Sequence, residues 1–145
     1  MGCDMTTGRG RYFRITASGM CDLRDWMASR EMVCTDYEDA DMPEYVAPEA
    51  VSCADEARRD SVQRDCELST AWRPTRWNHL LRRYVPLPGI AEHKLCSHDW
   101  WLITAAECRE ALDAWARSEQ ADRDAWPGWI DFLTAAVDEC GIVVR

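Results

Sequence analysis

The four residues Thr104-Ala105-Ala106-Glu107 constrain the fold most, because their spacing is that of a capping box. In this motif the threonine hydroxyl accepts a hydrogen bond from the amide three residues on, and the glutamate side chain reaches back to the threonine amide. Apolar residues then recur at helical spacing: Cys108, Ala111, Leu112 and Trp115. Because such a repeat lies along one side of a helix, the sequence predicts an amphipathic helix that begins here and packs on a core.

Three short apolar segments predict the strands of a small sheet. Residues 100–103 (Trp-Trp-Leu-Ile) suit a buried strand or a wedge between elements, and residues 11–16 alternate charged with apolar or β-favouring residues. Gly141 fits the left-handed position just past a helix end. The apolar residues 142–144 that follow it predict a closing strand, which we expect to pair with the strand of Tyr12.

Caps, prolines and apolar spacing predict the remaining helices. These helices cover residues 18–33, 49–66, 74–84 and 127–140. Their apolar faces are expected to meet the capped helix in one core through Leu23/Trp26/Met27, Leu112/Trp115 and Ile130/Leu133/Val137. The predicted fold class is therefore α+β, with three or four helices packed on a small sheet that includes the N- and C-terminal strands.

The length of 145 residues fits one domain that spans residues 1–145. Residues 1–9 show no periodicity and predict a loose tail. Residues 36–72 are poorly patterned and resemble an insertion, and they begin with an acidic loop over residues 36–44 that lacks the Asp/Asn-Gly arrangement of a calcium loop.

The composition predicts a cytoplasmic protein without a membrane partner. No apolar run approaches the roughly 20 residues that cross a bilayer, and the N-terminal residues lack the apolar segment of a secretory signal. The eight cysteines include no Cys-x-x-Cys pair. Without an export signal, such cysteines are expected to be free thiols in a reducing compartment.

The net charge of −9 is distributed unevenly along the chain. Residues 1–57 carry −7 and residues 99–145 carry −6, whereas residues 58–98 carry +4. An acidic protein with a basic middle is a poor general partner for duplex nucleic acid. A local site for an anion remains compatible with this pattern.

The predicted helix over residues 74–84 separates apolar from basic residues. Its apolar face holds Trp77, Leu80, Leu81 and Tyr84, and its basic face holds Arg76, His79, Arg82 and Arg83, with Arg73 and Lys94 nearby. Guanidinium groups bind phosphate or carboxylate through paired hydrogen bonds, and Trp72 and Trp77 can stack on a base. The alternative is a solvated face that balances acidic neighbours.

A second candidate site lies in His93-x-x-Cys96-x-His98-Asp99. Zinc accepts histidine, cysteine and carboxylate ligands in tetrahedral geometry, although this spacing matches no standard zinc site. The same residues offer a Cys–His nucleophile pair, with Asp99 orienting a histidine. The plain alternative is an ordinary loop that contains histidines near tryptophans.

Three further segments carry a resemblance to a family. They are Gly10-Arg11-Tyr12-Phe13-Arg14 before a helix, the His98-Asp99 turn before Ile103 and Glu107-Cys108, and Phe132-Leu133 followed by Gly141-Ile142-Val143-Val144. Together they resemble small uncharacterised proteins of actinobacterial phages and their hosts. The resemblance covers about half the chain, and it implies a compact α+β core and a phage-related setting.

The sequence thus predicts a non-enzymatic, cytoplasmic, phage-type accessory protein that needs no cofactor. Its expected partner is a host or defence protein, or a small phosphate-bearing ligand bound at the basic helix. One alternative is a zinc-dependent or thiol enzyme built on His93, Cys96, His98 and Asp99. Another is an acidic DNA mimic, although the 17 basic residues dilute such a surface.

Overall fold

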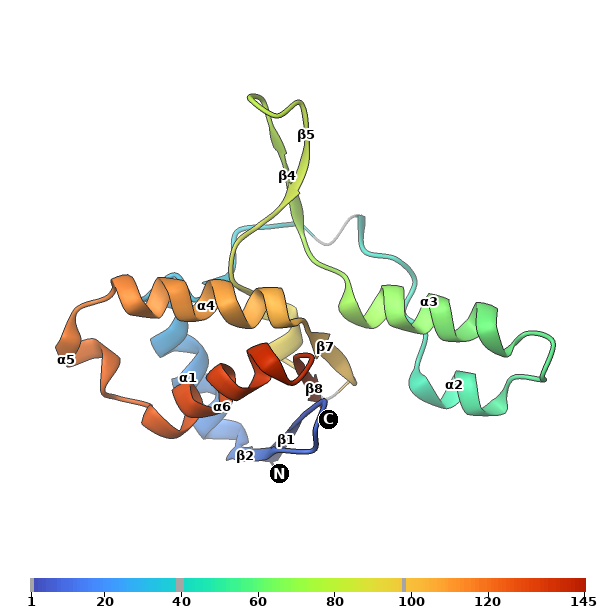
Figure 1. Ribbon diagram of the computed structural model, residues 1–145, viewed down its shortest axis with the longest axis horizontal. Helices are drawn as coiled ribbons and strands as arrows, with labels where there is room; N and C mark the ends of the chain where they lie inside the picture. Colours follow the sequence, from blue (N-terminus) through green and yellow to red (C-terminus); the bar gives the residue numbers. More distant parts are fainter. Residues whose placement is uncertain (1, 39–40, 98) are drawn as a thin grey trace.

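A four-stranded antiparallel sheet built from both chain ends forms the centre of the protein. The computed structural model describes residues 2–38, 41–97 and 99–145 (Figure 1). The strand order is β2-β1-β8-β7. The bounds are β1 Gly2–Thr7, β2 Tyr12–Thr16, β7 Trp101–Ile103 and β8 Ile142–Val144. This arrangement confirms the predicted α+β class and the terminal strands.

The first strand corrects two expectations. Residues 1–9 were expected to form a loose tail, but Gly2–Thr7 is β1, and it lies between β2 and β8. The closing strand therefore pairs with β1 and β7, and the strand of Tyr12 pairs with β1 alone. The burial of Cys3, Met5 and Thr7 explains the strand, because every second side chain points to one face. That alternation is hard to recognise when its inward residues are Cys, Met and Thr.

Three helices cover one face of this sheet. They are α1 Ala17–Ala28, α4 Ala105–Arg117 and α6 Pro127–Asp138. Buried side chains of the sheet lie opposite one another in register, as with Met5 and Val144 or Ile103 and Ile142, so they share that face. The expected core is confirmed: Leu23, Met27, Ile130 and Leu133 are buried in one cluster, and Trp26, Leu112, Trp115 and Val137 pack against it.

The helix ends follow local hydrogen bonding. The capping box of Thr104 and Glu107 is present as predicted at the start of α4. Helix α1 is shorter than the predicted 18–33: Thr16 caps it in place of Ser18, and it ends at Ala28. Glu31 then has a φ of 58°, and a left-handed residue at this place ends helices. The next residues form β3 (Val33–Cys34), which pairs in parallel with β6 (Ile90–Ala91).

Residues between β3 and β6 project from this body as two arms (Figure 1). The helical arm contains α2 (Pro48–Cys53) and α3 (Arg59–Ala71), where the sequence predicted one helix over 49–66. The hairpin arm contains β4 (Thr75–Asn78) and β5 (Arg83–Pro86), where the sequence predicted a helix over 74–84. The chain returns through β6 and the 3-10 helix η2 (Glu92–Leu95), and α5 (Gln120–Arg123) joins α4 to α6.

Within the described residues, no helix is both long and apolar enough to span a bilayer. All eight cysteines are free thiols, as expected from the sequence.

Replacement of Met5 by alanine tests the place of β1 in the core. Met5 is fully buried, and large-to-small changes at such sites cost about 2–5 kcal/mol of unfolding free energy. We expect urea denaturation to show a loss of that size. Leu68→Ala, on the exposed side of α3, is the control and should change stability by less than about 0.5 kcal/mol. Equal, small effects of both substitutions would mean that the N-terminus is a tail.

Candidate functional site

The hairpin arm carries most of the predicted ligand-binding residues. Its strands pair in the register Thr75–Pro86, Arg76–Val85, Trp77–Tyr84 and Asn78–Arg83. Opposed residues point to the same face of a two-stranded ribbon, and neighbours along a strand point to opposite faces. Arg76 and Arg83 therefore share one face, and Trp77 and Tyr84 share the other. The division into basic and aromatic faces holds for these four residues, and a β-ribbon makes it instead of a helix. His79 and Arg82 of the predicted basic face lie in the turn, where the His79 ring contacts Trp77.

The turn of the hairpin explains why the helical periodicity was misleading. The side-chain oxygen of Asn78 accepts hydrogen bonds from the amides of Leu80 and Leu81 at 3.0 and 2.9 Å. Asparagine readily makes such turns because its side chain imitates a backbone carbonyl. Arg82 then adopts a left-handed φ of 50° and leads into β5. Leu80 and Leu81 of the turn lie between Trp77 and Tyr84 in the sequence. The four apolar residues therefore recur at the spacing that one face of a helix would also show.

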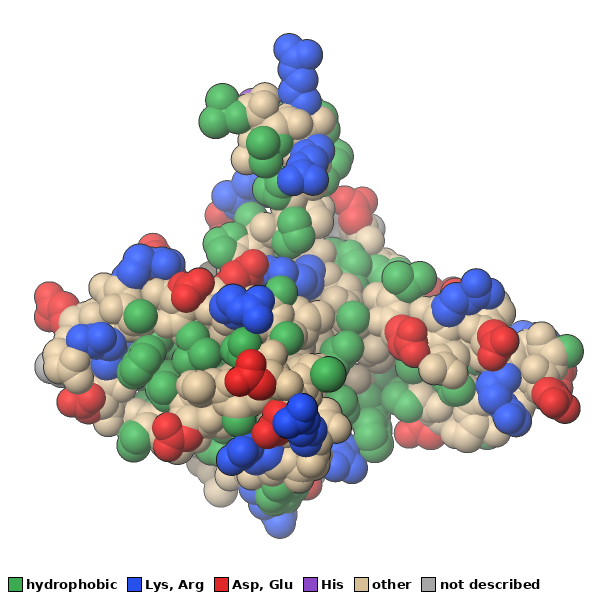
Figure 2. All heavy atoms as spheres, viewed as in Figure 1, with side chains coloured by type: hydrophobic (Ala, Val, Ile, Leu, Met, Phe, Trp, Pro, Cys, Tyr) green, Lys and Arg blue, Asp and Glu red, His purple; other side chains and the backbone are tan. Residues whose placement is uncertain are grey.

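The hairpin tip exposes large apolar side chains next to cations. Leu80 is 95% exposed and Tyr84 67% exposed, and Trp77 and Leu81 are also exposed. The rings of Trp77 and Tyr84 meet edge to face with centroids 5.2 Å apart, and His79 lies against Trp77 at 6.4 Å. Figure 2 shows hydrophobic and Lys/Arg side chains together on the projecting arm.

The basic residues of the hairpin differ in their surroundings. Arg76 lies near the base and contacts the Asp36 carboxylate at 3.4 Å. Within the described part of the chain, no carboxylate forms an ion pair with Arg82 or Arg83. Positive charge is therefore partly balanced at the base and unbalanced at the tip.

Trp72 does not belong to this surface. It follows α3 and packs against Tyr37 and His93, with ring centroids 6.3 and 5.5 Å away. These contacts turn its ring to Tyr37 and His93 and do not support the predicted stacking on a ligand beside Trp77, which stays a prediction.

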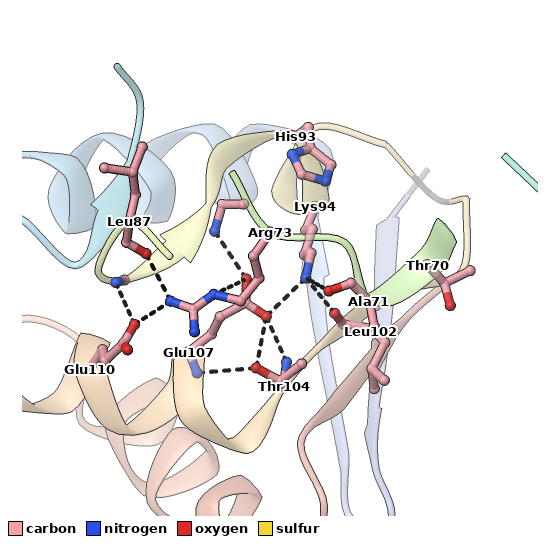
Figure 3. Close-up of polar contacts among 12 residues, drawn as sticks. Thr70, Ala71, Arg73, Leu87, His93, Lys94, Leu102, Thr104, Glu107 and Glu110 are labelled. Atoms are coloured by element: carbon pink, nitrogen blue, oxygen red, sulfur yellow. Dashed lines mark hydrogen bonds and ion pairs between the residues drawn. The ribbon is translucent and has the colours of Figure 1, made fainter. Parts of the chain in front are cut away.

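The base of the hairpin is fixed by a buried polar network that the sequence did not reveal (Figure 3). Lys94 and Glu107 are both fully buried, and the lysine ammonium lies 2.9 Å from the carboxylate. Lys94 also donates to the carbonyl oxygens of Leu102 (2.7 Å) and Ala71 (3.4 Å). Burial lowers the pKa of Lys94, and the adjacent Glu107 carboxylate opposes that shift.

The other members of this network come from the two ends of the hairpin arm. Arg73, just before β4, donates to the carboxylate of Glu110 and to the carbonyl of Leu87 at 2.8 Å. Glu110 also accepts from the amide of Gly89 at 3.0 Å. Both ends of the arm are thus bound to α4. Arg73 and Lys94, expected near the basic face, serve as anchors inside the protein.

The signal that could have found this network is the capping box itself. Glu107 accepts from the backbone amide of Thr104 at 2.8 Å, and the same carboxylate binds Lys94. A capping glutamate is usually solvated, but this one lies between an apolar strand and an apolar helix face. A buried carboxylate at that place requires a cation, and Lys94 is the sole lysine of the chain.

The residues of the second candidate site face different partners. The His93 ring nitrogen Nδ1 lies 2.7 Å from the Tyr37 hydroxyl, and Cys96 accepts from Arg24 at 3.1 Å. Asp99 is exposed, and its backbone carbonyl accepts from Tyr45. His98 lies outside the described residues. Among residues 2–38, 41–97 and 99–145, no three His, Cys, Asp or Glu side chains are arranged to hold a metal ion.

Comparison of the chain with protein-family models, with curated proteins and with solved structures finds no match. The resemblance to actinobacterial phage proteins therefore stays a prediction, and the assignment of function depends on the geometry of the chain itself.

A double-mutant cycle on the buried pair tests the anchor. Lys94→Met and Glu107→Gln should each lower the unfolding free energy by about 3–5 kcal/mol, because each leaves one polar group buried without its partner. The double variant should lose clearly less than the sum, measured by urea denaturation. Arg109→Gln, at an exposed position of α4, is the control. Additive losses would show that the pair is not coupled.

Proposed function

We propose that this protein is a non-enzymatic binding protein whose hairpin arm docks on an acidic, partly apolar surface of another protein. The observation that carries the proposal is the projecting hairpin, which exposes leucine, aromatic and arginine side chains together at its tip. The resemblance to phage proteins favours a host or defence protein as the partner. The hairpin replaces the helix as the element that presents the basic residues.

The charge of the arm supports an anionic partner. Residues 75–86 contain three arginines and neither aspartate nor glutamate, so they carry +3 in a chain of net charge −9 and leave −12 for the rest. Cations separated in this way from a strongly acidic body steer an acidic partner to the arm and repel one from the body. The orientation of the complex is then set before contact.

The shape of the arm favours a protein over a small ligand. Small molecules bind in concave pockets that enclose most of their surface, whereas the exposed tip projects from the body (Figure 2). The hollow of about 420 Å³ at the base is lined by Arg76 and Arg117, but also by Asp36, Glu31 and Glu110. Those carboxylates would oppose a phosphate there.

The apolar residues favour a protein over nucleic acid. Leu80 and Leu81 gain free energy only against an apolar surface, at about 25 cal/mol per Å² of area removed from water. A phosphate backbone offers no such surface, and the acidic body repels a long polyanion. The described geometry of His93 and Cys96 favours neither a zinc nor a thiol enzyme, and a cationic arm does not suit a DNA mimic.

Two pairs of substitutions test the docking role. Leu80→Asp/Leu81→Asp removes the apolar contact, and Arg76→Glu/Arg83→Glu reverses the charge of the basic face. Central interface residues are worth about 2–4 kcal/mol each, so we expect each double variant to weaken binding to the purified partner by roughly 100-fold or more. The partner is first isolated by cross-linking from the host, and its Kd is then measured by biolayer interferometry.

Matched controls lie on the helical arm. Arg58→Glu/Arg59→Glu makes the same charge change at exposed positions, and Leu68→Asp makes the same polarity change; both should bind as the unmodified protein does. Binding should also weaken between about 50 and 500 mM salt, because the screening length shortens. Hairpin-dependent binding to single-stranded DNA or to anionic lipid vesicles, without a protein partner, would contradict the proposal. Unchanged affinity of both hairpin variants would do so as well.

A further inference from the structure

A group of cysteines lies around one cavity, apart from the hairpin arm. The cavity holds about 160 Å³ and is bounded by β1, by one side of α1, and by the chain that follows η2. The side chains that matter here are Cys3, Cys21, Arg24 and Cys96. They come from three segments distant in the sequence, so that no motif indicates their proximity.

Arg24 provides the polar contact at this cavity. Its Nη1 atom lies 3.1 Å from the sulfur of Cys96, and the hydrogen bond to Cys96 is the main cause of a raised pKa of Arg24. Its Nε atom lies 3.9 Å from the carboxylates of both Asp25 and Glu92. These carboxylates hold the guanidinium from another side, while the nitrogen that faces the cavity binds the sulfur.

The cysteines around the cavity differ in accessibility. Cys96 and Cys21 are exposed, whereas Cys3 is buried, and burial raises the pKa of the Cys3 thiol to about 11. Cys3 therefore stays protonated and unreactive. A cysteine beside an arginine and open to solvent has the surroundings of reactive thiols, because the thiolate is the nucleophile and the cation stabilises it.

We propose that Cys96 is a thiol-modification site that reacts with hydroperoxides and small electrophiles, with Cys21 as the thiol that resolves the oxidised form. The partner of the sulfur is Arg24 of α1, whereas the sequence suggested a histidine of the same segment. The proposal is independent of the docking role of the hairpin arm.

The oxidation proceeds in two balanced steps. The Cys96 thiolate attacks one oxygen of the hydroperoxide, the O–O bond breaks, and the second oxygen leaves as hydroxide or alkoxide and takes a proton from water. The product is a sulfenic acid at Cys96. The Cys21 sulfur then displaces the sulfenic hydroxyl, which leaves as water with the proton of Cys21. Two thiols lose two electrons, and the peroxide gains them.

The product would be a covalent link between α1 and the chain after η2. Helix α1 already packs on η2, and Glu92 and Lys94 belong to that 3-10 helix. The link would therefore join α1 to the segment that supplies the buried lysine.

Competitive labelling of the full-length protein tests the site. The reduced protein is treated with a limiting amount of iodoacetamide at neutral pH, and peptide mass spectrometry gives the rate at each cysteine. We expect Cys96 to react roughly five- to tenfold faster than the exposed Cys53 and Cys140, since the guanidinium of Arg24 lies against its sulfur and can stabilise the attacking thiolate. Equal rates at Cys96 and Cys53 would overturn the proposal without any variant.

Variants separate the cation from simple exposure. Arg24→Gln should lower the Cys96 rate to that of Cys53, Arg24→Lys should retain part of it, and Arg109→Gln should leave it unchanged. If Arg24→Gln does not fold, the role of Arg24 is decided by the Cys96 rate in Arg24→Lys and by the order of the cysteine rates in the unmodified protein. With hydrogen peroxide, the unmodified protein should form a Cys21–Cys96 disulfide, and Cys21→Ser should accumulate the sulfenic acid, trapped by dimedone. If Cys96 still reacts fast with iodoacetamide in Arg24→Gln, the role of Arg24 is refuted. If hydrogen peroxide produces a disulfide that excludes Cys21, the role of Cys21 as the resolving thiol is refuted.

Discussion

The buried ion pair between Lys94 and Glu107 is the contact on which the arrangement of the whole molecule depends. Its oxygens and nitrogen bind the start of α4, the carbonyl of β7 and the end of α3. Isolated charges at such depth would cost several kcal/mol each, so each ion is acceptable only because the other is present. The pair therefore requires that η2, α4 and α3 meet at one place, and it makes that meeting specific.

The two arms depend on this place for their direction. The helical arm ends at Ala71, whose carbonyl accepts from Lys94, and the hairpin arm begins at Arg73, which binds Glu110. One residue lies between these two anchors. A displacement of the pair would thus move both arms together, and the exposed tip of the hairpin would be presented at a different angle to any partner. The contacts of Lys94, Glu107 and Arg73 therefore hold both arms to the body of the protein.

The sequence predicted the helices and three strands of the body well, but missed its strand β1 and predicted the arms poorly, for physical reasons. The capping box, the strand of Tyr12 and the closing strand have strong local signals, since each combines periodicity with a distinct start or end. The local sequence signal of the hairpin is ambiguous, because four apolar residues spaced around a tight turn also fit one face of a helix. The Asn78 turn and the left-handed φ of Arg82 distinguish the hairpin from a helix. The sequence does not predict a left-handed φ at an arginine.

The candidate sites show the same limit. Arg76 and Arg83 lie on one face of the ribbon and Trp77 and Tyr84 on the other, so this part of the expected separation survives the change from helix to ribbon. Trp72, His93 and Cys96 contact residues distant in the sequence, because neighbours in sequence turn to different partners in space. Contacts such as Arg24 with Cys96 span 72 positions, and no local pattern reports them.

The sole lysine of the chain lies at full burial, beneath both arms. The folded protein therefore presents no side-chain amine to solvent, and its cationic surface is made of arginine alone. Amine-directed chemistry, whether an acylating reagent, an immobilisation coupling or an enzyme that marks lysines, would find no lysine side chain until the protein opens. Acylation of the Lys94 amine would therefore report local opening around the Lys94–Glu107 pair. The acylation rate would follow how often the junction of body and arms comes apart.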